Sequence, residues 1–169
     1  MTRLITIGIA SLLFFCCAYA QTFKGVFQFH NDGTGKVLYC DSGKKIYTHA
    51  SGSEDYQNWE INYIDEDEKG KFFTIKNVKT DVYLTQLWGN IVGLKGPATS
   101  ALSHWYIKVE SNETVQIINR YTDDSLDGDY NTVFPTKANK SIYPKWKIVK
   151  WLHGDESPKE SKAFIWWCW

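Results

Sequence analysis

The densest run of side chains that could ligate a metal lies at residues 123–129, Asp-Asp-Ser-Leu-Asp-Gly-Asp. Closely spaced carboxylates around a glycine are the chemistry that a calcium-binding loop uses. Such a loop also needs a bidentate acid at its twelfth position, and Phe134 stands there. Leu126, inside the run, fits a core position instead. We therefore expect no metal site in this segment.

The other reactive side chains form no catalytic pattern. The four histidines are scattered along the chain without metal-ligand spacing, and no motif assembles a nucleophile, a base and an orienting group. The 19 basic and 19 acidic side chains are mixed along the sequence, whereas nucleic acids and anionic lipids require a basic patch. The sequence therefore predicts no enzyme, no cofactor and no nucleic-acid partner.

The N-terminal segment indicates export from the cell. Arg3 precedes an apolar run from Leu4 to Cys17, which ends in Ala18-Tyr19-Ala20, the small-x-small pattern that signal peptidase cleaves. We interpret residues 1–20 as a signal peptide and expect a secreted, extracellular protein that begins at Gln21. A buried N-terminal helix is the alternative interpretation.

Two cysteines remain after this cleavage, Cys40 and Cys168. In an oxidising compartment they could form an internal disulfide, which the chain-entropy model values at about 4–5 kcal/mol for so long a loop. Two free or intermolecularly paired thiols are the alternative. The sequons at Asn112 and Asn139 fit a secreted glycoprotein.

An internal repeat underlies these features and predicts the fold. The frame Asn-x-x-Thr-x-x-x-Leu occurs three times, starting at Asn31, Asn77 and Asn119. Alternating apolar residues precede each frame, and a tryptophan with isoleucine two residues later follows it: Trp59, Trp105 and Trp146. The alternation has a period of two, which predicts strands with one buried face. Asn and Thr suit the turns between them.

Four short strands in each of three copies predict an all-β fold of twelve strands. Closing them into a barrel with a hairpin cap would remove exposed strand edges. We expect one domain at residues 21–151, with copies at about 22–65, 66–111 and 112–151. Residues shared by all three copies are best explained by the scaffold, so a binding site is expected where the copies differ.

This pattern resembles the β-trefoil superfamily, and most closely its ricin B-type lectin branch. The resemblance covers Phe23 to Trp151 and rests on four segments: Phe73–Leu84, Gly35-Lys36-Val37-Leu38, Leu126-Asp127 and the Gln-x-Trp of Gln57-Asn58-Trp59. Ser103 and Pro144 replace the glutamine in the other two copies, so the Gln-x-Trp repeat is degenerate. Growth-factor-like and inhibitor trefoils share much of the same scaffold signature.

The resemblance implies a sugar pocket in each copy. It is built from an acidic residue just after the frame leucine, an aromatic residue and an amide. The carboxylate would fix two sugar hydroxyls while the ring covers the apolar face of the pyranose. The third copy keeps the acid as Asp127, with Phe134 as the aromatic residue and Asn139 as the amide. We expect Asp127 to carry any sugar that is bound.

The other two copies have lost the acid at this position. In the first copy Tyr39 replaces it, and Asp41 two residues later, with Tyr47 nearby, makes a second candidate carbohydrate site. In the second copy Thr85 replaces it and no usable acid follows.

The sequence therefore predicts a secreted carbohydrate-binding protein with a single working or degenerate site. The alternative is a secreted trefoil whose loops bind a protein, as a protease inhibitor, an effector or a growth-factor-like receptor ligand. The Gln-x-Trp and the Asn-x-x-Thr frames favour the first, and the incomplete sugar triads favour the second. The expected partner is thus a glycan or glycoprotein, or a protein target.

The C-terminal residues 152–169 form a polar linker and an aromatic tail, Ala163–Trp169. Aromatic clusters of this size are rarely left in water. Either the tail folds back on the barrel and is tethered through Cys168, or it contacts a partner or a membrane interface, where tryptophan is favoured. Seven apolar residues are too few to span a bilayer.

Overall fold

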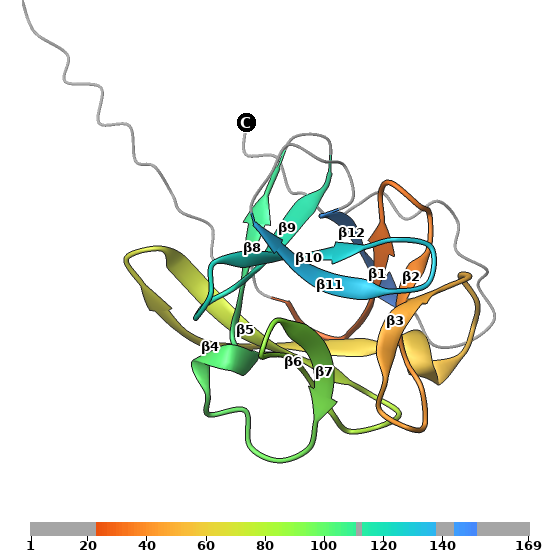
Figure 1. Ribbon diagram of the computed structural model, residues 1–169, viewed down its shortest axis with the longest axis horizontal. Coiled ribbons are helices and arrows are strands. Elements are labelled where there is room, and N and C mark those ends of the chain that lie inside the picture. The colour runs from red at the N-terminus through yellow and green to blue at the C-terminus, as the bar shows by residue number, and fades with distance from the viewer. Residues whose placement is uncertain (1–22, 111–112, 138–143, 152–169) are drawn as a thin grey trace, which may run out of the picture.

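The computed structural model describes residues 23–110, 113–137 and 144–151 (Figure 1). The first copy contains β1 (Val26–Asn31), β2 (Val37–Cys40), β3 (Ile46–His49), the 3-10 helix η1 (Asp55–Gln57) and β4 (Trp59–Asp67). The second contains β5 (Gly70–Asn77), β6 (Tyr83–Leu87), β7 (Asn90–Leu94), the 3-10 helix η2 (Ala101–Ser103) and β8 (Trp105–Val109). The third contains β9 (Val115–Asn119), β10 (Asp124–Gly128), β11 (Val133–Lys137) and β12 (Lys145–Trp151). The prediction of an all-β β-trefoil is confirmed.

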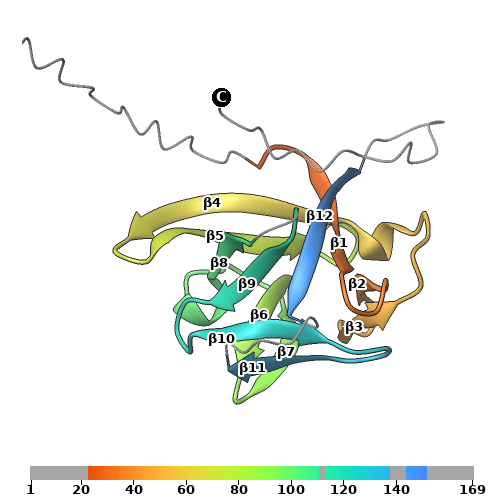
Figure 2. The same cartoon turned by 90° about the horizontal axis from the view of Figure 1, so that it is seen from above.

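Six strands close into a ring. Strand β1 pairs with β12 and β4, β5 pairs with β4 and β8, and β9 pairs with β8 and β12, all antiparallel. The other six strands form three hairpins, β2–β3, β6–β7 and β10–β11. Figure 2 shows β6–β7 and β10–β11 on the side of the molecule away from β4. The ring leaves none of its six strands with an unpaired edge.

The first copy extends beyond the predicted boundary at residue 65. Strand β4 continues to Asp67, because Asp65, Glu66 and Asp67 pair with residues 70–72 of β5 after an irregularity at residues 63–65. The acidic side chains of this run are tolerated because they lie on the outer part of a long hairpin rather than in the core.

The three repeat tryptophans occupy equivalent places in the core, in keeping with a scaffold role for residues that all three copies share. All three are 0% exposed. Each indole Nε1 donates a hydrogen bond to the carbonyl oxygen of the frame leucine in its own copy, Trp59 to Leu38 at 3.0 Å, Trp105 to Leu84 at 2.9 Å and Trp146 to Leu126 at 2.9 Å. A buried indole N–H needs such a partner, which explains why tryptophan and leucine recur together.

The frame asparagines build the same turn in each copy. The side-chain oxygen accepts from the backbone N–H groups two and three residues later, in the turns after Asn31, Asn77 and Asn119. The next residue donates its N–H to the carbonyl before the tryptophan of the preceding copy, with Asp32 bonded to Lys145, Val78 to Asn58 and Arg120 to His104, each at 2.9 Å. The frame therefore joins each copy to its neighbour around the ring.

Several predictions concern residues outside the described ranges. The signal peptide (1–20), the sequons at Asn112 and Asn139, the aromatic tail and Cys168 lie there. Cys40 lies in the core on β2, with its sulfur 3.2 Å from Oγ1 of Thr80, and its disulfide with Cys168 stays a prediction. Within the described ranges, the structure has no helix of the length and apolarity that crossing a membrane requires.

Candidate functional site

The three hairpins bring the predicted sugar-site positions face to face. The residue after each frame leucine lies directly opposite the residue at the predicted aromatic position: Tyr39 opposite Tyr47, Thr85 opposite Val92, and Asp127 opposite Phe134. Copies one and three thus present an aromatic ring at this pair, and copy two does not.

Copy three brings two of its three predicted residues together. Asp127 on β10 is only 4% exposed, and its Oδ1 accepts from the backbone N–H of Gly128 at 2.7 Å. Phe134 on β11 lies across from it and is 39% exposed. The predicted amide, Asn139, lies outside the described residues. The pair combines a carboxylate with a partly exposed ring, although little of the carboxylate is open to solvent.

Burial raises the pKa of Asp127 above its ordinary value of 3.8, and the charge of Asp129 adds to this while the Gly128 N–H opposes it. A raised folded-state pKa means that the folded state disfavours the ionised form, so a stability penalty develops as the pH rises through that pKa. We therefore expect Asp127→Asn to raise the melting temperature at pH 7 and to lose this advantage once the pH falls below the ordinary aspartate range.

Asp129→Asn is the matched control with the opposite sign. Backbone N–H groups of Asn131 and Thr132 lower the pKa of Asp129, so its charged form contributes stability that is present at neutral pH and lost in acid. Melting curves of both variants from pH 2 to pH 8 test these signs. A fall in melting temperature for Asp127→Asn at pH 7 would contradict the argument.

Copy one holds a cluster of four rings, which we call the copy-one aromatic cluster: Tyr39, Tyr47, His49 and Tyr56. The ring centroid of Tyr39 lies 5.1 Å from that of Tyr47, 5.0 Å from His49 and 5.6 Å from Tyr56. Strands β2 and β3 supply the first three rings, and η1 supplies the fourth. Tyr39 is buried at the centre, Tyr47 and Tyr56 are half-buried, and His49 is exposed.

Carboxylates lie at the edge of this cluster. Tyr39 donates its hydroxyl to Oε2 of the exposed Glu54 at 2.9 Å. Burial and this hydrogen bond raise the pKa of Tyr39 to about 12, so its hydroxyl stays a donor at physiological pH. Asp41 lies in the β2–β3 turn, where its Oδ1 accepts from the backbone N–H of Lys45 at 2.9 Å. Aromatic faces and polar groups therefore share one surface.

Sequence reasoning identified part of this surface. It selected Asp41 and Tyr47 but treated Tyr39 as the loss of an acid, and it missed Glu54 and Tyr56. In the structure another loop supplies a carboxylate beside Tyr39. Glu54 lies just before η1, fifteen residues later in the sequence, and accepts the hydrogen bond from the Tyr39 hydroxyl. The Gln-x-Trp just after Tyr56 could have shown that this loop folds back on the hairpin.

Copy two has a small pocket of different character, of about 120 Å³. Its walls include Tyr83, Leu87, Leu94 and Leu102. At the position of the acid, the hydroxyl of Thr85 pairs with that of Ser103 at 2.8 Å. The Thr85 hydroxyl also bonds the carbonyl oxygen of Tyr83 at 3.1 Å. The pocket thus has a half-buried tyrosine at its wall, but no carboxylate lines it.

No protein-family model and no curated protein matches this sequence. Solved structures do match. The BEL β-trefoil aligns with a TM-score of 0.66 and 13% identity, over 76% of this chain and 94% of its own. SeviL, bound to asialo-GM1 saccharide, aligns with 0.65 and 16%, over 76% and 98%. The exo-β-1,3-galactanase 1,3Gal43A from Clostridium thermocellum aligns with 0.66 and 17%, over 75% of this chain but 30% of the enzyme. Likeness at such low identity shows the β-trefoil fold.

Proposed function

We propose that this protein is a secreted carbohydrate-binding β-trefoil whose main sugar site is the copy-one aromatic cluster. The observation that carries the proposal is the convergence of Tyr39, Tyr47 and Tyr56 with the carboxylate of Glu54. A half-buried tyrosine offers an apolar face to a pyranose ring, and carboxylate and imidazole groups at its edge bond the sugar hydroxyls.

The structural neighbours support this proposal at the level of the fold. One of them is a β-trefoil with a bound saccharide that aligns over 98% of its own length, and another belongs to an enzyme named for a galactan. Because neither resembles this chain closely in sequence, the sugar itself must come from experiment. The secretory part of the proposal rests on the signal-peptide pattern of residues 1–20.

Asp127 and Phe134 make the second candidate site for the same function. Their direct pairing in the β10–β11 hairpin supports this role, and the burial of Asp127 argues that it would contribute one hydrogen bond rather than two. The two candidate sites lie on different hairpins, so single substitutions can separate them.

Protein binding through the loops is the second candidate function, and Trp88 favours it. This side chain stands at the tip of the β6–β7 hairpin and is 90% exposed, with a backbone φ of 48°. A bulky residue in the left-handed region is strained, and an exposed tryptophan gains nothing from folding. Large exposed rings of this kind commonly anchor protein partners.

We expect Tyr47→Ala to weaken glycan binding by roughly tenfold or more, since losing a stacked ring removes on the order of 1–2 kcal/mol of contact. A glycan array would identify the sugar, and titration calorimetry of the mature protein would measure its affinity. Tyr63→Ala, which removes an exposed tyrosine of β4, serves as the control and should leave binding unchanged.

Asp127→Ala completes the design. Loss of binding in this variant alone would move the site to copy three, and loss in Tyr47→Ala alone would assign it to copy one. If the array detects a ligand and neither substitution weakens it, both candidate sites are wrong. If no glycan binds, the protein-binding function becomes the better one, and Trp88→Ala tests it against a captured partner.

A further inference from the structure

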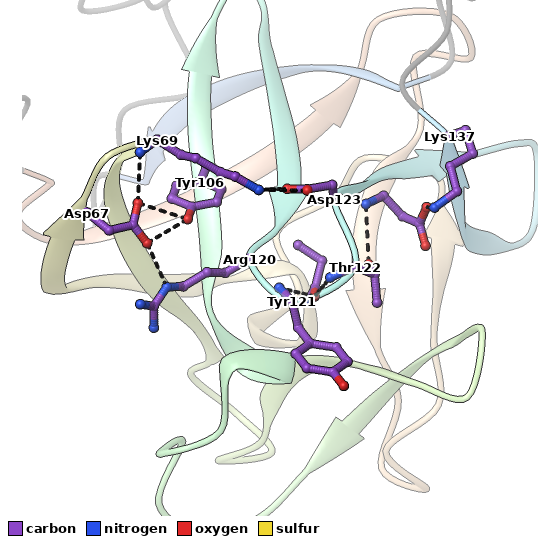
Figure 3. A network of polar contacts seen from close by, with 10 residues as sticks. Asp67, Lys69, Tyr106, Arg120, Tyr121, Thr122, Asp123 and Lys137 are labelled. Atoms are coloured by element: carbon purple, nitrogen blue, oxygen red, sulfur yellow. Dashed lines mark hydrogen bonds and ion pairs between the residues drawn. The ribbon is translucent and has the colours of Figure 1, made fainter.

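A broad hollow of about 430 Å³ lies where the end of copy one meets copies two and three, and its lining shares no residue with the pocket of copy two. The end of β4 contributes Asp67 to its walls, the turn to β5 contributes Glu68 and Lys69, β8 contributes Tyr106, and the frame turn of copy three contributes Arg120 and Tyr121. Figure 3 shows Asp67 between Tyr106 and Arg120, while the Lys69 side chain extends to Asp123. The threefold scaffold requires none of these side chains, because other residue types stand at the matching positions of the other copies.

Arg120 is held rigidly at this hollow. Its Nε donates to Oδ2 of Asp67 at 3.0 Å, and its guanidinium carbon lies 3.8 Å from the ring centroid of Phe72. One terminal nitrogen lies 3.5 Å from Nδ1 of His104, whose ring stacks on the same Phe72. An arginine fixed along one edge and one face presents its remaining N–H groups in a set direction, with little entropy left to lose on binding.

Asp67 positions Arg120, and both of its carboxylate oxygens are already occupied by hydrogen bonds within the protein. Its Oδ1 accepts from the backbone N–H of Lys69 at 3.0 Å, its Oδ2 accepts from Arg120, and the hydroxyl of Tyr106 bonds both oxygens at 3.0 and 2.8 Å. Lys69 is occupied as well, because its Nζ contacts both carboxylate oxygens of Asp123 at 2.8 and 2.6 Å.

Three groups therefore stay available to a ligand within the described part of the chain. They are the outer N–H groups of Arg120, the exposed carboxylate of Glu68 and the ring of Tyr121, which is 71% exposed. Together they offer hydrogen-bond donors, acceptors and an apolar face around one open space. This set matches a ligand that carries both hydroxyl groups and C–H surface.

The charges of the hollow decide the class of that ligand. Arg120 is balanced by Asp67 and Lys69 by Asp123, which leaves Glu68 as the unbalanced charge. An acidic ligand would meet this carboxylate without a spare cation to compensate it. We propose that this hollow is a separate binding site for a neutral saccharide residue, with Arg120 as donor, Glu68 as acceptor and Tyr121 as the stacking ring. This proposal does not depend on sugar binding by the copy-one aromatic cluster.

Isotope-labelled NMR of the mature protein tests this site directly. The probes are the methyl glycosides of galactose, glucose, mannose and N-acetylglucosamine, with methyl glucuronide and N-acetylneuraminic acid as acidic probes. We expect at least one neutral glycoside to shift the Arg120 Nε–H and the Tyr121 amide resonances in a saturable way, and the acidic probes to shift them less.

Two substitutions measure the contribution of the site. Tyr121→Ala should weaken the affinity for the glycoside, measured from the saturable shift at Arg120, roughly fivefold, as expected for the loss of one stacked ring. Arg120→Lys keeps the charge but loses the planar fork, and should weaken binding about tenfold. Tyr63→Ala is the matched exposed-tyrosine control. If Arg120→Lys changes resonances throughout the spectrum, its fold is altered, and the affinity of Tyr121→Ala then decides whether the site exists.

The outcomes separate this proposal from the function proposed above. Shifts at Tyr47 and His49 without shifts at Arg120 and Tyr121 would overturn the second site and keep the first. Shifts at Arg120 that persist in Tyr47→Ala would support the second site independently. Absence of any neutral-glycoside shift at Arg120, a stronger response to the acidic probes, or full affinity in Tyr121→Ala would each overturn it.

Discussion

Replacing Trp105 by alanine is expected to lower the free energy of unfolding by about 3–5 kcal/mol. The side chain is fully buried in the shared core, so its removal leaves a cavity that the closed ring of strands cannot collapse to fill. It also removes the partner of the Leu84 carbonyl oxygen, which Nε1 contacts at 2.9 Å. Denaturant unfolding followed by circular dichroism would measure the loss.

The chain provides a matched control in Trp88. This tryptophan is 90% exposed, so Trp88→Ala should change the free energy of unfolding by less than about 0.5 kcal/mol. Because Trp59 and Trp146 make the same bond in the other copies, their alanine variants should resemble Trp105→Ala. A loss below about 1 kcal/mol for any of the three would mean that its surroundings are not a packed core.

Asn77→Ala is expected to cost about 2–4 kcal/mol, because it leaves several buried polar groups without partners. The Asn77 side chain accepts from the backbone N–H of Lys79 at 3.1 Å and from both the N–H and the hydroxyl of Thr80 at 3.0 Å. It donates to the carbonyl oxygens of Tyr56 at 2.9 Å and Asn58 at 3.2 Å. One buried side chain thus holds its own turn and the preceding copy.

Asn77→Asp tests the two donated bonds. The aspartate keeps the acceptors for the turn, but at neutral pH it buries a charge and sets a carboxylate oxygen against the carbonyl oxygens of Tyr56 and Asn58, so this variant should be at least as unstable as Asn77→Ala. Asn90→Ala is the surface control, since Asn90 is exposed and makes one bond to the Trp88 carbonyl. Equal stability of Asn77→Ala and Asn90→Ala would disprove the structural role of the frame asparagine.

The fold could be predicted because its causes recur in the sequence. A tryptophan that must bond a leucine carbonyl, and an asparagine that must close a turn, appear three times in register because the same contact is made three times. Strand periodicity then completed the assignment. The approximate copy boundary at residue 65 falls inside β4, because the pairing with β5 continues through the acidic run to Asp67.

The binding surfaces were less predictable because the side-chain contacts that build them occur in one copy only and are not repeated in the sequence. Glu54 reaches Tyr39 from the position just before η1, which Ser100 fills before η2 in copy two, and Arg120 meets Asp67 across 53 residues. Neither contact leaves a spacing pattern in the chain. Sequence reasoning could mark positions where the copies differ, such as Tyr39 and Asp127, but which side chains converge there depends on the loops between the strands.

The pairing of β1 with β12 has a consequence for how the chain folds as it is synthesised. These two strands pair along six residues, from Val26 opposite Trp151 to Asn31 opposite Trp146. Until residue 151 has left the ribosome, β1 lacks this neighbour and the ring stays open. The barrel therefore closes after synthesis of its last strand, by contacts of the largest sequence separation, which favours slow folding. Meanwhile the edge of β1, with Phe27 and Phe29, stays open, as does the edge of β9 that later pairs with β12. Such open strand edges can pair with other nascent chains and aggregate.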